Sequence, residues 1–204
     1  MSSYIHNAGL VQTVNPQLCV LADLNGATTI PGGVQLDSTN CYDGDNTSFE
    51  RLIRAGWLLA KIAATGKYVT VKRTVAVGAG SSATALIVSN AAAFKAGDSI
   101  LIGATAAVVS SIVYSTDTIT LTAAKTWADG AVVYVSGSDA AVAVLGEDVQ
   151  LYDKNLQVAT DATAGTVYRE GMLVASALKG DVTACRAVSA NLITKNFTLD
   201  TDLM

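Results

Sequence analysis

Residues 99–121 read SILIGATAAVVSSIVYSTDTITL, and this stretch is the clearest indication of the fold. Branched and apolar side chains fill Ser99–Ile102, Ala107–Tyr114 and Thr118–Leu121, and the turn Ser115-Thr116-Asp117 separates the last two segments. Val, Ile and Thr favour strands because their branched Cβ atoms restrict χ1. Strands of about five residues that alternate with turns are typical of a small β-barrel or sandwich.

The same pattern extends over Ala76–Gly137, where we predict further strands at Ala85–Val88 and Ala131–Val135. This stretch is almost uncharged, and its only acidic and basic residues are Lys95, Asp98, Asp117, Lys125 and Asp129. Small, flexible residues border it at Gly78–Ser82 and Ser136–Ser138 and are expected to act as hinges. We therefore predict that 76–137 is an inserted, separable β module whose two ends lie close together.

The flanking segments, 49–75 and 138–204, are predicted to form one discontinuous β body. Trp57–Ile62 and Tyr68–Arg73 read as a hairpin around Thr65-Gly66-Lys67. The remaining predicted elements are a capped turn over Ser48–Gly56, strands at Ala140–Leu145, Val149–Tyr152, Thr166–Arg169, Met172–Ala175 and Leu192–Leu199, a turn at Glu170-Gly171, and one helix over Asp181–Ala190 with Asp181 as its N-cap.

Residues 1–48 are rich in turn residues such as Pro31-Gly32-Gly33 and Asp43-Gly44-Asp45, and only Leu18–Leu24 and Gly33–Leu36 look extended. Because so irregular a segment buries little of its own surface, we expect an extended N-terminal arm. The arm would lie on the body or on a neighbouring chain, and would be mobile in the free protein. The predicted fold class is thus mainly β: a compact β-sandwich or barrel-like body with one or two short helices, an inserted small barrel-like module and this arm.

The composition excludes several classes of function. Of the 204 residues, half are hydrophobic, only 6% are aromatic and 15% are charged, and the net charge is −4. An acidic chain does not favour nucleic-acid phosphates, and no apolar run is long enough to cross a bilayer. The three cysteines are odd in number and widely spaced, and the first residues do not resemble a secretory signal, so we expect reduced thiols and synthesis in a reducing cytoplasm.

None of the candidate chemical motifs predicts a catalytic, cofactor-binding or metal-binding residue. His6 lies in the predicted arm, where a catalytic base would lack a rigid site. The acidic stretch Asp43–Glu50 lacks the spacing of an EF-hand, and Gly78-Ala79-Gly80 lacks the residues of a phosphate-binding loop. Glu147-Asp148 is interpreted as a solvated acidic turn. We therefore predict that the protein is not an enzyme.

Two further features suggest partners only weakly. Arg51, Arg54, Lys61, Lys67, Lys72 and Arg73 form one mildly basic region, which we interpret as a solvated strand face or a contact with an acidic partner. Trp127 is the strongest candidate for an aromatic platform that could stack on a sugar.

Two separated stretches resemble the head decoration, or cement, proteins of tailed bacteriophages. GWLLAKIAATGKY (Gly56–Tyr68) is similar to that family's hairpin G-x-L-L-x-K-I-T-x-S-G-K-Y. AAVAVLGEDV (Ala140–Val149) resembles its strand A-V-G-V-L-x-E-D-V, and VYREG (Val167–Gly171) followed by Ala177-Leu178 resembles its segment V-x-R-x-G-x-x-x-x-x-L. The resemblance covers neither residues 1–48 nor Ala76–Gly137.

This resemblance implies a non-enzymatic virion protein that binds the outer surface of the mature capsid and stabilises it by bridging subunits of the major capsid protein. It also implies a homotrimer. Contacts with the capsid are expected in the arm, 1–48, with no individual residue assigned. The alternatives are a tail, neck or baseplate-associated virion protein, or an adhesive or carbohydrate-binding module built on the insert.

Overall fold

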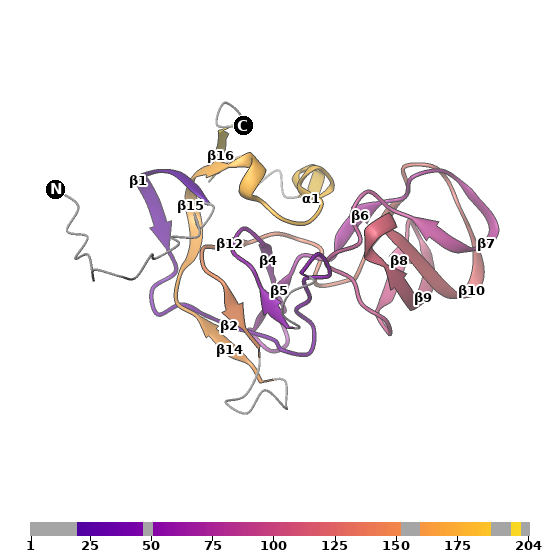
Figure 1. Cartoon of the computed structure of the whole chain (residues 1–204), viewed down its shortest axis with the longest axis horizontal. Coiled ribbons are helices and arrows are strands. Elements are labelled where there is room, and N and C mark those ends of the chain that lie inside the picture. Colours follow the sequence, from indigo (N-terminus) through magenta and orange to yellow (C-terminus); the bar gives the residue numbers. More distant parts are fainter. Residues whose placement is uncertain (1–19, 47–50, 152–159, 189–196, 201–204) are drawn as a thin grey trace, which may run out of the picture.

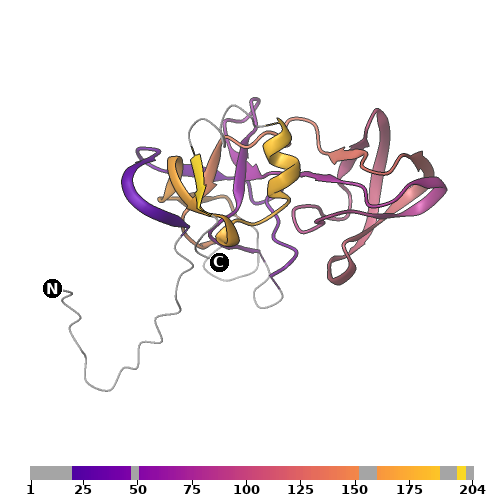
Figure 2. The same ribbon diagram turned by 90° about the horizontal axis from the view of Figure 1, so that it is seen from above.

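The chain is mainly β, as the sequence predicts, and its strands form two large sheets that lie side by side (Figure 1, Figure 2). The computed structural model describes residues 20–46, 51–151, 160–188 and 197–200. One sheet belongs to the body and the other to the insert. The described helices are short and comprise Tyr114–Thr116 (η1), Ala175–Ala177 (η2) and Val182–Val188 (α1).

The body sheet is built from strands that come from both ends of the described chain. They are Leu21–Thr29 (β1), Val34–Leu36 (β2), Leu58–Lys61 (β4), Tyr68–Thr70 (β5), Ala143–Leu145 (β12), Ala162–Ala164 (β14), Val167–Val174 (β15) and Phe197–Asp200 (β16). Their order is β1-β15-β12-β4-β5-β2-β14, with β16 parallel to β15. The predicted hairpin is confirmed as β4 and β5, with Ala60 opposite Val69. Leu58, Leu59 and Ala60 are all buried, so both faces of the sheet are covered at β4.

The described part of the predicted arm, residues 20–46, packs on the body, which is one of the two placements expected, and it contributes β1 and β2 to the body sheet. Val34 and Leu36 are buried, and β2 lies between β5 and β14, with Leu36 opposite Tyr68. A strand of three residues is too short to show a clear alternation, and both of its partners follow it along the chain at a distance. The sequence pattern therefore gave no sign of these pairings. Residues 1–19 lie outside the described residues.

The insert forms a six-stranded sheet that curls into a small barrel. Its strands are Arg73–Val75 (β6), Gly80–Ile87 (β7), Ser99–Ile102 (β8), Thr105–Val113 (β9), Thr118–Trp127 (β10) and Val132–Tyr134 (β11). They run in the order β6-β11-β8-β9-β10-β7, and a bridge between Ala76 and Val88 joins the two edges. Leu86, Ile100 and Ile119 fill the interior and are fully buried. Because β6 belongs to this sheet, the insert begins near Arg73 rather than at the predicted Ala76.

The predicted hinge at Gly78–Ser82 is also corrected, because Gly80 already begins β7 and pairs with Trp127 of β10. A Cβ atom on Gly80 would lie 2.4 Å from the Trp127 ring, so this glycine allows the indole to pack directly on the backbone. Two smaller predictions are also wrong, because residues expected in turns belong to strands. Leu52–Ile53 is a short strand (β3) paired with Val149–Gln150 (β13) instead of part of a capped turn, and Glu170-Gly171 lies within β15.

Helix α1 lies between the body and the insert in both views (Figure 1, Figure 2). Asp181 caps it as predicted, since its Oδ1 accepts the Ala184 N–H at 2.9 Å. The other oxygen, Oδ2, accepts hydrogen bonds from the hydroxyls of Thr74 and Ser89 in the insert. The single carboxylate therefore connects the helix to the seam of the barrel, where β6 meets the segment that follows β7.

The chain enters and leaves the insert at one junction, as predicted for the ends of the module. The Lys72 N–H donates to the Ser138 carbonyl at 2.8 Å, and the Val135 N–H donates to the Lys72 carbonyl at 3.1 Å. The Lys72 Nζ atom lies 2.8 and 2.7 Å from the two carboxylate oxygens of Asp98, and both side chains are buried. Burial lowers the pKa of Lys72, and the Asp98 carboxylate partly opposes this shift.

A second contact joins the insert to the segment 37–46 of the body. The rings of Tyr42 and Tyr114 stack with centroids 5.6 Å apart, and the Gly44 N–H donates to the Ala92 carbonyl at 2.8 Å. A Cβ atom on Gly44 would lie 2.2 Å from the Tyr114 ring, so this close approach requires a glycine. The insert therefore packs on the body along one side, and its separability stays a prediction.

We predict that the Lys72–Asp98 pair stabilises the junction. Replacing Asp98 with Asn leaves the buried ammonium without its carboxylate, and should lower the free energy of unfolding by about 3–5 kcal/mol. The matched control is Asp129→Asn, because Asp129 accepts the Gly78 N–H at an exposed site and its loss should cost less than about 1 kcal/mol. Urea titration measures both values. Equal, small effects of the two changes would show that the junction does not depend on this pair.

Candidate interaction surface

The acidic side chains of the candidate catalytic and metal-binding motifs bind other groups within the chain. The Asp43 carboxylate is fully buried and binds the Arg54 guanidinium through two bonds of 2.6 and 2.7 Å. This contact raises the pKa of Arg54. A guanidinium thus lies where a calcium ion would have to bind, and a calcium loop at Asp43–Glu50 does not fit the described part of this segment. Glu50 itself lies outside the described residues.

Glu147 and Asp148 each fix a neighbouring loop. Glu147 Oε1 accepts the N–H groups of Gly165 and Thr166, and Asp148 Oδ1 accepts the Ala55 N–H at 2.7 Å. The two carboxylates therefore bind backbone groups of the body, and they do not face each other across a groove as the pair of a glycosidase would.

Two free cysteines, Cys41 and Cys185, are buried. Burial raises the pKa of each thiol to about 12, so neither carries appreciable thiolate at neutral pH. His6 and Cys19 lie outside the described residues. Within the described ranges, no three His, Cys, Asp or Glu side chains gather where they could hold a metal ion. The described helices include none that is long and apolar enough to cross a membrane.

The basic region predicted between Arg51 and Arg73 is largely neutralised by internal partners. Besides Arg54 and Lys72, Lys67 binds Asp161, and Arg73 lies 3.5 Å from Asp139. Trp127 is only 8% exposed, and its indole N–H donates to the Gly78 carbonyl. It is therefore a packing residue of the barrel and not an open platform for a sugar ring.

The few charged residues of the insert are also used internally. Asp98 binds Lys72, Asp117 accepts the Ala91 N–H, and Asp129 accepts the Gly78 N–H. Lys95 donates to the Thr39 carbonyl at 2.6 Å. Lys125 is left as the one charged residue of 76–137 without a hydrogen-bond or ion-pair partner among the described residues. The barrel thus has few charged side chains, and Asp98 is the one that pairs with an opposite charge among the described residues.

An exposed row of apolar side chains crosses this charge-poor surface. Val113 of β9 is opposite Thr118 of β10, which is opposite Ile87 of β7. The row continues to Val77, whose N–H donates to the Ile87 carbonyl at 2.8 Å beside the closing bridge. Directly opposed residues of antiparallel strands share one face, so all four side chains point outward together. Val77, Ile87 and Val113 are each about half exposed, at 53%, 49% and 50%.

We call Val77, Ile87, Val113 and Thr118 the outer row. Contiguous exposed apolar patches mark contact surfaces for other macromolecules, so the outer row is a candidate for such a surface. Sequence reasoning did not identify it, because the four residues come from four separate segments. Only the strand register brings them into line.

Comparisons with known proteins found no matching family model, no similar curated protein and no similar solved structure.

We predict that neighbouring residues of β7 differ sharply in their contribution to stability. Leu86 is fully buried, so Leu86→Ala should lower the free energy of unfolding by about 2–5 kcal/mol. Ile87 points outward, so Ile87→Thr, which keeps a branched Cβ, should change it by no more than about 0.5 kcal/mol. Thermal or urea unfolding gives both values. A large loss from Ile87→Thr would mean that the outer row is covered by the chain itself.

Proposed function

We propose that this chain is a capsid decoration protein. It binds the outer surface of a mature viral capsid, bridges subunits of the major capsid protein and stabilises the shell, and it does so as a homotrimer. The observation that carries the proposal is the outer row on a barrel that has only five charged residues over 76–137. An interface on such a surface desolvates few charges, and each unpaired charge that it would otherwise bury costs several kcal/mol.

The resemblance to phage decoration proteins supports the same function. Its three motifs contribute β4, β5, β12 and β15, which are direct neighbours in the order β15-β12-β4-β5 at the centre of the body sheet. Segments that are separated by the whole insert thus contribute to one continuous unit. The insert, which the resemblance does not cover, projects beside this unit and carries the outer row (Figure 1).

The homotrimer is implied by the resemblance, and closed cyclic symmetry makes it physically reasonable. Stable protein interfaces bury about 800 Å² on each partner, which is more than four side chains supply. The outer row is therefore proposed as the centre of a larger contact. Because the protein binds only the assembled shell, each bound copy shifts the equilibrium toward the assembled state, and many copies add their effects.

The proposal is tested by co-sedimentation of the purified protein with mature shells of the virus that encodes it. The wild-type chain should sediment with the shells. The double variant Ile87→Lys, Val113→Lys should bind at least tenfold more weakly, because two ammonium groups would have to be desolvated at the centre of the contact.

The matched control is the double variant Ala63→Lys, Ala64→Lys, which introduces the same two charges at exposed positions of the body, outside the outer row. This variant should bind within about twofold of the wild type. Equal binding by the double variant and the wild type would remove the outer row from the contact. Failure of the wild-type chain to bind shells would favour a tail, neck, baseplate or adhesive role.

A further inference from the structure

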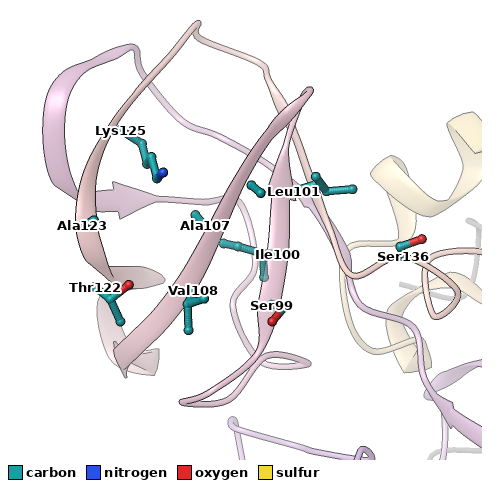
Figure 3. A pocket seen from close by; sticks show the side chains of 10 residues that line it. Ser99, Ile100, Leu101, Ala107, Val108, Thr122, Ala123, Lys125 and Ser136 are labelled. Carbon is teal, nitrogen blue, oxygen red and sulfur yellow. The ribbon is translucent and has the colours of Figure 1, made fainter.

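A wedge-shaped pocket opens in the wall of the barrel where two neighbouring strands diverge (Figure 3). Strands β9 and β10 pair from Val113 opposite Thr118 to Val109 opposite Leu121, and their register ends there. Beyond this point β9 continues against β8, with Ala107 opposite Ile100, while β10 continues against β7. The pocket between them has a volume of about 390 Å³, within the range of small-ligand sites.

The divergence comes from a wide bulge in β10. Thr120 is opposite Ala85 and Lys125 is opposite Ala83, so five positions along β10 span only two along β7. The extra residues arch away from the sheet and leave the edge of β9 from Thr105 to Val108 with β8 as its one strand partner among the described residues. An unpaired edge presents backbone N–H and C=O groups that can pair with another strand.

The wall of the wedge is mainly apolar, but it contains one cation. Ile100, Ala107 and Val108 line one side, and Ala123 and Lys125 come from β10 on the other. In Figure 3 the Lys125 side chain points from β10 toward the β8–β9 hairpin. Lys125 is partly buried, and it is the same residue that lacks a hydrogen-bond or ion-pair partner within the described chain. An ammonium group in such surroundings favours a carboxylate as its ligand.

We propose that this wedge binds an extended acidic peptide segment of a partner protein. The segment adds a strand to the free edge of β9 along Thr105–Val108, inserts an apolar side chain against Ile100 and Ala107, and places a carboxylate at Lys125. Strand addition of this kind takes its affinity from backbone hydrogen bonds and its specificity from side-chain pockets. This site is distinct from the outer row, and it does not depend on the proposed binding to a capsid.

The test uses the full chain and a labelled, acetylated Val-Thr-Val-Glu-Val-Thr peptide, whose binding is followed by fluorescence anisotropy. The probe should bind with a dissociation constant below about 1 mM and at least tenfold more tightly than its twin with Lys in place of Glu. Lys125→Glu should reverse this preference, whereas Lys61→Glu, a matched change at an exposed site on β4, should leave it unchanged.

A second pair of probes separates strand addition from simple binding of a carboxylate. A peptide N-methylated at alternate residues keeps its charge but loses backbone donors, so it should bind at least tenfold more weakly. Hexanoate should not compete with the peptide at equal concentration. Equal binding of the N-methylated peptide, an unchanged charge preference in Lys125→Glu, or no binding of the wild-type chain at about 1 mM would each overturn the proposal.

Discussion

The buried ion pair between Lys72 and Asp98 fixes how the two sheets of this protein meet. Lys72 lies where the chain passes from β5 of the body into β6 of the insert, and its backbone bonds to the returning segment at Val135 and Ser138. Asp98 lies in the turn before β8, on the barrel side. Two buried charges are tolerated only when each satisfies the other, so the pair favours one arrangement of the junction. Asp181 adds to this constraint by binding Thr74 and Ser89 while it caps α1.

The fixed junction also sets which surfaces of the barrel face outward. Internal hydrogen bonds hold the side chains of four of the five charged residues of 76–137, and one of these residues, Asp98, is also paired with an opposite charge. The remaining surface combines exposed apolar side chains with a single cation that lacks a partner within the described chain. A surface of this kind is inexpensive to desolvate, and this property supports the proposed binding of a large partner.

Local sequence patterns predicted the elements whose partners are near in the chain. The β4–β5 hairpin, the short strands of the insert and the Asp181 cap all follow from residues within a few positions of one another. The parallel contact of Leu36 with Tyr68 and the membership of β6 in the barrel depend on pairings over long distances, which alternation in one segment does not reveal. The outer row needs the register of four segments, and the wedge needs a bulge that shifts Lys125 relative to Ala83. Neither leaves a contiguous motif in the sequence.

The central claim, that this chain stabilises a viral shell from its outer surface, is tested most directly by heat-induced release of the genome. Viral particles that are proposed to carry the chain would be prepared with and without it, and exposure of the genome would be followed by a nucleic-acid dye as temperature rises. Particles without it should release the genome several degrees earlier, and adding back the purified chain should restore the difference. Release at the same temperature from both kinds of particle would contradict the account.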